Sequence, residues 1–95
     1  MYGYVYKIQH ENYYYIGQTK LTIEQRFNTH WSARNRTNKI YRYMKNTNKA
    51  DWKLTELEHV PISELRKRES TYICLKDPYC LNAENNYIDW AKYGM

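Results

Sequence analysis

The sequence predicts a small α+β domain in which a three-stranded antiparallel sheet is flanked by helices. Two short runs rich in tyrosine and β-branched residues lie close together at the start of the chain, and a third run follows near its middle. Segments with helical spacing of apolar residues lie between and after these runs. With 95 residues, the chain has room for one domain, and we expect it to cover residues 1–95.

The first two strands are expected at residues 2–8 and 13–18, with a polar turn at residues 9–12 between them. If Tyr6 and Tyr15 lie on the same face of this hairpin, their two phenol hydroxyls lie close together. The third strand is expected at residues 52–60, where Pro61 closes it.

The first helix is expected to begin at Ile23, because Thr22 and Gln25 have the spacing of a capping box. Apolar side chains then recur every four residues, at Ile23, Phe27 and Trp31. Arg26 and His30 are also four residues apart, so both should project from one side of the helix beside the buried stripe.

Two further helices are expected at residues 38–45, capped by Thr37, and at residues 64–75, capped by Ser63. The expected inward positions are Ile40, Tyr43, Met44, Leu65, Tyr72 and Ile73. Glu69 shares the inward face of the later helix, and a carboxylate there needs a polar partner or a metal ion. A short helix is expected at residues 87–92.

The chain carries 15 Lys and Arg against 10 Asp and Glu, for a net charge of +5. This balance favours a polyanionic partner, although many small soluble proteins share it. No stretch approaches the roughly 18 apolar residues of a membrane span, and the start does not resemble a secretory signal. We therefore expect a cytoplasmic protein, and the abundance of Asn, Lys, Tyr and Ile suggests an AT-rich bacterial, phage or mobile-element source. Cys74 and Cys80 lack the spacing of a zinc site and are not expected to form a disulfide.

Several short motifs, taken in chain order, resemble the GIY-YIG nuclease family. They are Tyr4-Val5-Tyr6, Tyr15-Ile16-Gly17, Arg26, His30, Glu69 and Asn82. The resemblance covers essentially the whole chain and implies the same fold of three strands flanked by helices. The sequence departs from the pattern at Tyr4, where the family has glycine, and Gly3 lies one place earlier.

The resemblance implies that Tyr6 is the general base and that Tyr15 orients water or phosphate. A free phenol has a pKa near ~10, and we expect Arg26 and a metal ion nearby to lower it. His30 is suited to accept or relay a proton near neutral pH. The alternative is that both tyrosines fill a core with their hydroxyls hydrogen-bonded, and that His30 is a polar residue at the helix edge.

Arg26 is a candidate phosphate clamp because its planar guanidinium can donate to two phosphate oxygens. Glu69 is the candidate ligand of Mg²⁺ or Mn²⁺, which prefer carboxylate oxygen. The alternatives are a solvated Arg26 and a salt bridge from Glu69 to Arg66 or Arg68. The resemblance implies that Asn82 braces the site, and Asn85 and Asn86 are nearby rivals for that role.

DNA is the expected partner, through phosphate contacts that do not depend on sequence. The candidate contact residues are Lys7, Gly17, Lys20, Arg34, Arg36, Lys39 and Arg42. The chain has no base-reading module, so sequence recognition would need loop residues, a dimer or a partner protein. The expected function is a metal-dependent DNA endonuclease that hydrolyses phosphodiester bonds. The alternatives are a nucleic-acid-binding module that does not cut and a structural domain that recruits another protein.

Overall fold

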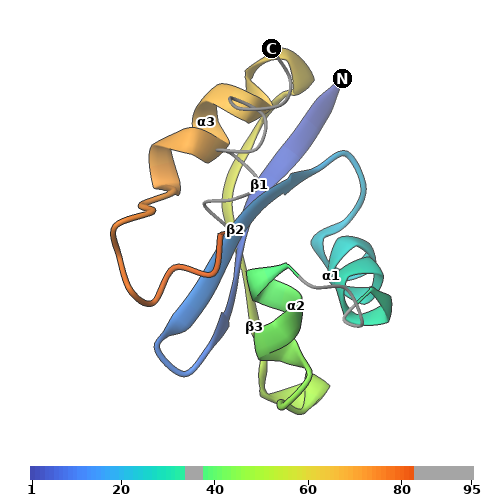
Figure 1. The fold of residues 1–95 in the computed structure, drawn as a ribbon. Helices are drawn as coiled ribbons and strands as arrows, with labels where there is room; N and C mark the ends of the chain where they lie inside the picture. The colour runs from blue at the N-terminus through green and yellow to red at the C-terminus, as the bar shows by residue number, and fades with distance from the viewer. Residues whose placement is uncertain (34–37, 83–95) are drawn as a thin grey trace.

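The computed structural model describes residues 1–33 and 38–82. The elements follow in the order β1 (Tyr2–His10), β2 (Tyr13–Thr19), α1 (Ile23–Ser32), α2 (Lys39–Met44), η1 (Lys49–Asp51), β3 (Lys53–Pro61), η2 (Ile62–Glu64) and α3 (Leu65–Tyr72). The strands form one antiparallel sheet in the order β2–β1–β3, which leaves β2 at an edge. Figure 1 shows α3 on one side of this sheet and α1 and α2 on the other. The predicted α+β fold class is confirmed.

The opening hairpin is tighter than expected, because its turn contains only Glu11 and Asn12. Glu11 adopts a left-handed backbone conformation with φ of 54°, and the side-chain amide of Gln9 donates to its carbonyl oxygen at 2.9 Å. A two-residue turn of this kind matches the twist of the strands that it joins. The first strand therefore extends two residues closer to the turn than expected, while the second begins at residue 13 as expected.

Two hydrophobic clusters fill the two faces of the sheet. Beneath α1 and α2 the buried members are Tyr6, Ile8, Phe27, Ile40, Met44, Trp52 and Leu81. Beneath α3 they are Val5, Ile16 and Leu65. The apolar stripe predicted along the first helix forms the α1 side of the first cluster, because Phe27 is buried there and Ile23 and Trp31 pack at its margin.

The predicted cap of α1 is confirmed: the Thr22 hydroxyl accepts from the Gln25 backbone, and the Gln25 side chain accepts in return from the Thr22 backbone. Ile40 and Met44 of α2 are buried as expected, while Thr37 lies outside the described residues.

The predicted cap and one inward position of the third helix are wrong. Ser63 is not a cap, because the turn η2 runs directly into α3 and Glu64 is the residue that precedes the helix. Tyr72 does not face inward: it is exposed, and its hydroxyl donates to Glu58 Oε2 at 2.6 Å. The helix also ends at Tyr72 rather than at residue 75, since Ile73 has extended backbone.

The third strand begins one residue later than predicted, because Trp52 caps the end of η1 and points into the core instead. Its indole nitrogen donates to Thr47 Oγ1 at 2.9 Å. Pro61 is the last residue of β3, where an edge strand tolerates a missing amide proton. The helix predicted at residues 87–92 lies outside the described residues. Within the described ranges, no helix has the length and apolar character that a membrane span requires.

Candidate active site

The register of β1 and β2 places the two candidate tyrosines on one face of the sheet. Tyr6 lies opposite Gly17 and Ile8 lies opposite Tyr15, so all four side-chain positions face α1 and α2. A Cβ atom at Gly17 would overlap the Tyr6 hydroxyl. The absence of a side chain at Gly17 thus leaves the space that the Tyr6 ring occupies as it lies across β2.

Tyr4, which replaces the glycine of the first motif, has a ring partner on the neighbouring strand. It pairs with His59 of β3, and the two rings stack with centroids 4.6 Å apart and planes 11° apart. The glycine one place earlier, Gly3, faces the opposite side of the sheet, where a Cβ atom would crowd Leu65. The departure from the motif is therefore accommodated by cross-strand stacking.

His30 is held from α1 directly against these tyrosines. Its Nε2 lies 2.8 Å from the Tyr6 hydroxyl, and its ring meets the Tyr15 ring edge-on, with centroids 5.1 Å apart. The side chain is only 1 % exposed, so His30 is a buried residue rather than one at a polar helix edge. Its second nitrogen, Nδ1, lies 3.1 Å from the hydroxyl of Tyr41 on α2.

Burial decides the protonation of this cluster. It lowers the pKa of His30 to about 4, and the nearby Arg26 charge adds to the shift, so the imidazole is neutral at neutral pH. Burial also raises the pKa of Tyr6, with a further contribution from Tyr15, and it raises the pKa of Tyr15 to about 12. Arg26 opposes both shifts, as expected, but burial outweighs it. The lowering expected from Arg26 is present but smaller than the effect of burial, and the lowering expected from a metal ion stays a prediction.

Arg26 lies one helical turn before His30 with its side chain half-buried. Its charge affects the pKa of both tyrosines and of His30 and Glu69, which places it among all four. Among the described residues, Arg26 Nε is a buried nitrogen without a hydrogen-bond partner. A buried donor in that state is costly, and an anion bound beside it would satisfy it.

An open hollow of about 300 Å³ lies beside Arg26. Its walls come from β2, the turn after it, α1 and the start of α3. They are formed by Gln18, Thr19, Lys20, Leu21, Arg26, Thr29 and Leu65. Two cations and several polar groups around an open space suit an anionic chain better than an apolar ligand.

Glu69 reaches the same edge of the sheet from α3. Its Oε1 accepts from the side-chain amide of Gln18 at 3.2 Å, and Gln18 is the neighbour of Gly17. Its charge contributes to the raised pKa of Tyr6 and of Tyr15. Because β2 is an edge strand, groups from the two faces of the sheet can approach each other around it.

The alternative salt bridge for Glu69 is not formed with Arg68, which pairs instead with Glu58 at 2.7 Å. Burial raises the pKa of Glu69, while Gln18 and the charges of Arg66 and Arg26 oppose the shift. Within the described residues, no three His, Cys, Asp or Glu side chains are grouped as a metal site. Glu69 is therefore a single carboxylate, and one carboxylate together with water and substrate phosphate is a set of ligands that can hold Mg²⁺.

Asn82 braces β2 from outside the sheet. Its side-chain oxygen accepts from the Ile16 amide at 2.9 Å, and its side-chain nitrogen donates to the Ile16 carbonyl at 2.8 Å. The preceding segment runs parallel to β2, with Leu81 N donating to the Tyr14 carbonyl at 2.7 Å. Figure 1 shows this segment, in orange, returning from α3 to β2. The rivals Asn85 and Asn86 lie outside the described residues.

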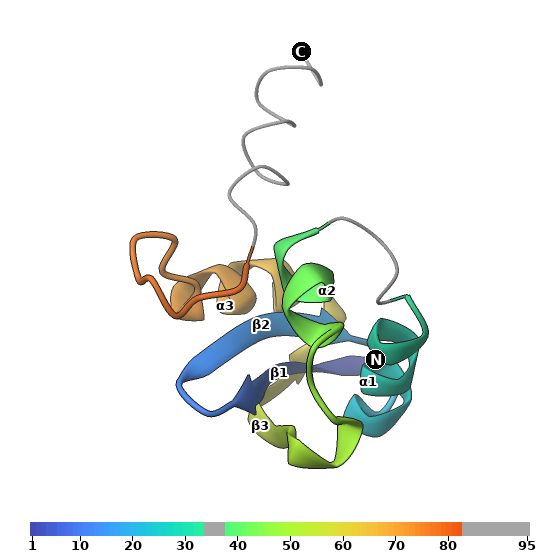
Figure 2. The same ribbon diagram turned by 60° about the horizontal axis from the view of Figure 1, so that its bottom comes forward.

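The basic residues are distributed unevenly. Lys20, Lys39 and Arg42 are exposed, and Lys7 is half-buried on the α3 face. Lys39 also has a structural contact, because its Nζ donates to the Cys80 carbonyl at 3.0 Å. Arg34 and Arg36 lie outside the described residues. In the view of Figure 2, α2 lies over the sheet beside β2. The helix that carries Lys39 and Arg42 is therefore on the same face of the sheet as the tyrosine cluster, which is Tyr6, Tyr15 and Tyr41 around His30.

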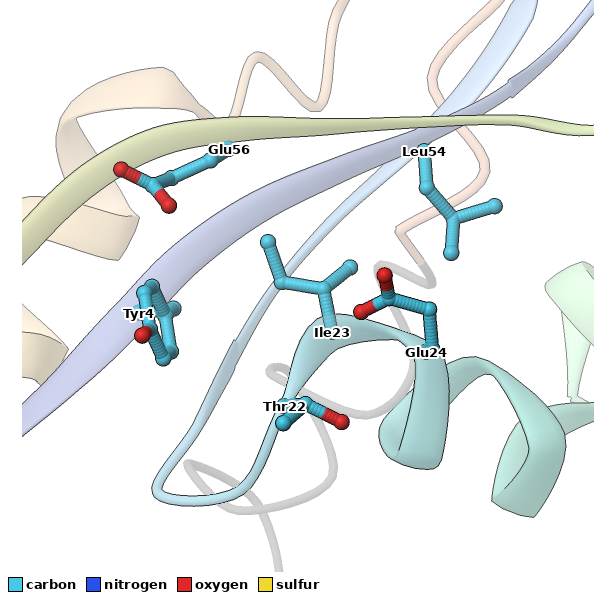
Figure 3. Close-up of a pocket in the computed structure, with 6 residues that line it drawn as sticks. All are labelled: Tyr4, Thr22, Ile23, Glu24, Leu54 and Glu56. Atoms are coloured by element: carbon cyan, nitrogen blue, oxygen red, sulfur yellow. The ribbon is translucent and has the colours of Figure 1, made fainter.

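A second hollow, of about 320 Å³, lies where the start of α1 faces β1 and β3. Figure 3 shows the carboxylates of Glu24 and Glu56 beside it, with Tyr4, Ile23 and Leu54 completing most of its wall. Two carboxylates disfavour a phosphate there. The charge around the two hollows therefore favours the one beside Arg26 for a nucleic-acid backbone.

Comparison with protein-family models matches residues 2–93 to the GIY-YIG catalytic domain. Because the match covers nearly the whole chain, the protein belongs to the GIY-YIG family, whose nucleases act on DNA. Searches of curated proteins and of solved structures returned no significant match.

Tyr41 is the residue at this site that the sequence did not reveal. Its side chain contacts His30 from α2, eleven residues later in the chain. No motif or spacing joins the two positions, because the contact depends on how α2 packs beside α1.

Proposed function

We propose that the chain is a metal-dependent endonuclease that hydrolyses phosphodiester bonds of DNA. The observation that carries this proposal is the buried hydrogen bond between Tyr6 and His30, 2.8 Å long, next to a guanidinium whose Nε has no partner among the described residues. A neutral phenol, a neutral imidazole and a cation in one place suit proton transfer beside a phosphate.

Tyr6 and His30 would act together as the general base. The raised pKa of Tyr6 leaves it as a phenol, which is too weak a base alone. While the water oxygen attacks phosphorus, the bond from phosphorus to the leaving sugar oxygen breaks, and that oxygen takes a proton from solvent. On the attacking side, a proton of the water passes to the Tyr6 oxygen and the Tyr6 proton passes to His30 Nε2. The imidazole thus becomes the final acceptor, and no free phenolate has to form at neutral pH.

Arg26 and Tyr15 would position the substrate. The unpaired Nε of Arg26 would donate to a phosphate oxygen and balance the charge that grows in the transition state. Tyr15, which lies on the same face as Tyr6, would orient the water or the phosphate. Glu69 would hold Mg²⁺ or Mn²⁺, and a bound ion supplies charge neutralisation at the phosphate and at the leaving oxygen.

The test replaces Glu69 by glutamine, which keeps the shape and removes the charge. We expect the wild type to nick supercoiled plasmid only with Mg²⁺ or Mn²⁺, and Glu69→Gln to lose on the order of 10²–10³-fold in rate. Glu64→Gln is the matched control, because Glu64 is exposed at the start of the same helix. Circular dichroism and thermal melting would show that both variants remain folded.

Full cutting by Glu69→Gln would remove the metal role from this residue. A mobility shift of DNA without cleavage under any metal condition would instead favour the binding module that does not cut. Arg26→Ala separates phosphate binding by Arg26 from metal binding by Glu69. Loss of the phosphate clamp should remove cleavage even where the metal still binds.

A further inference from the structure

The hydrogen bonds of His30 involve two tyrosines and not one. Tyr6 lies 2.8 Å from Nε2, and Tyr41 lies 3.1 Å from Nδ1. His30 is 1 % exposed, so neither ring nitrogen can easily exchange its partner for bulk water. A neutral imidazole has one N–H and one lone pair, so one tyrosine must donate to it and the other must accept from it.

The surroundings of Tyr6 decide which tyrosine donates. Its hydroxyl carries a proton, and Arg26, whose positive charge acts on the Tyr6 pKa, offers only donors. Among the described residues, His30 Nε2 is the one acceptor that the Tyr6 hydroxyl reaches. Tyr6 therefore donates to Nε2, which leaves the proton of His30 on Nδ1 and directs it to the oxygen of Tyr41.

We propose that Tyr41 is a positioning residue that accepts the Nδ1 proton of His30 and so holds the imidazole in the tautomer that can take a proton from Tyr6. The hydroxyl proton of Tyr41 is free to face solvent, because its side chain is only partly buried. The other groups that face His30 are Tyr15 from β2 and Arg26 from α1, and neither provides a competing acceptor for Nδ1.

The role in cleavage rests on the proposed function, whereas the tautomer does not. The first measurement therefore uses the intact protein without DNA or metal. Long-range ¹H–¹⁵N NMR spectra of uniformly ¹⁵N-labelled protein distinguish the two tautomers of each histidine at pH 7. The chain has three histidines, and the His30 signals are assigned by their loss in His30→Gln.

We expect the wild type to show protonated Nδ1 and bare Nε2 at His30. In Tyr41→Phe, which removes only the hydroxyl, the buried Nδ1 proton has no acceptor, and the signals should move toward the other tautomer or a mixture. Plasmid cleavage should then fall about tenfold, as expected for loss of one hydrogen bond that aligns a proton acceptor.

Tyr43→Phe is the matched control. Tyr43 lies on the same helix, and its hydroxyl lies 2.8 Å from Nδ1 of His10, away from the tyrosine cluster. This variant should leave the tautomer of His30 and the cleavage rate unchanged. It therefore separates loss of the hydroxyl at Tyr41 from a general weakening of α2.

A wild-type spectrum with the proton on Nε2 of His30 would overturn the inference, and it needs no variant to fold. An unchanged tautomer in Tyr41→Phe would also overturn it. If no form of the protein cuts DNA, the proposed function fails, while the spectra still decide whether Tyr41 sets the tautomer.

Discussion

His30 is one of two buried polar residues among those the structure describes, and its environment favours the uncharged form. Desolvation lowers its pKa to about 4, and the positive charge of Arg26 acts in the same direction. A surface histidine would be partly charged near pH 6.5 and could not serve reliably as the acceptor of the Tyr6 proton. Burial thus ties the chemistry of one side chain to the stability of the whole domain.

We expect His30 to make stability depend on pH. In the unfolded chain it takes up a proton near pH ~6.5, whereas in the fold it does so only near pH 4. The contribution of neutral His30 to the free energy of unfolding is therefore complete above pH ~6.5 and is lost as the pH falls toward 4. The free energy of unfolding should fall by about 3 kcal/mol over this range. Urea unfolding at pH 7 and pH 4.5 measures it.

The control for this pH dependence is His59→Gln, because His59 is exposed. This variant should lose as much stability on acidification as the wild type does, whereas His30→Gln should lose less. An equal loss in all three proteins would assign the pH dependence to other groups.

At the level of secondary structure, the segment after α3 completes the edge of the sheet. Residues 79–82 bond along β2, and Asn82 gives Ile16 both the donor and the acceptor that an adjacent strand would supply. This brace holds the strand that carries both Tyr15 and Gly17, and with Gly17 it fixes the path of the Tyr6 ring. The segment that follows α3 thereby stabilises the position of Tyr6, the candidate general base.

Asn82→Ala removes both bonds to Ile16 at once. We expect it to lower the free energy of unfolding by about 1–3 kcal/mol, because a backbone amide and carbonyl lose their partners. Hydrogen exchange at the Ile16 amide should speed up accordingly. Asn46→Ala, at an exposed position after α2, should change stability by less than about 0.5 kcal/mol. Unchanged exchange at Ile16 would show that the brace contributes little.

At the scale of the whole molecule, the charges around the two hollows differ. Lys20 and Arg26 border the hollow near the tyrosine cluster, and Arg42 lies exposed on α2. Glu24 and Glu56 border the second hollow. Together with the net charge of +5, this difference favours a polyanion that runs over β2 and α2 and away from the acidic hollow.

We expect DNA binding to weaken steeply with salt, because each phosphate contact releases counterions. Arg42→Gln should reduce the slope of log K against log salt by about 1. Lys67→Gln is the control, since Lys67 is exposed on α3, on the opposite side of the sheet. Fluorescence anisotropy with Glu69→Gln as the background and chelator in the buffer measures binding without cleavage. A matching effect of Lys67→Gln would contradict the predicted path of the DNA.

Local patterns in the sequence were sufficient for most of the fold. The alternation around Tyr6 and Tyr15, the capping box at Thr22 and the four-residue stripe through Phe27 each depend on neighbours in the chain. The start of α3 and the orientation of Tyr72 were mispredicted, because a short 3₁₀ turn and the partner Glu58 decided them. Neither of these leaves a periodic signal.

By itself, the sequence determined the sheet, the helices that flank it and the family motifs that name Tyr6, Arg26 and Glu69. Only the tertiary structure decided that His30 is buried and neutral, that burial outweighs the effect of Arg26 on the phenol pKa values, and that Tyr41 contacts the far side of the imidazole. The reason is physical: desolvation and long-range hydrogen bonds depend on which elements pack together. Helical and strand periodicity reports which face of an element is buried, but not which side chain it meets there.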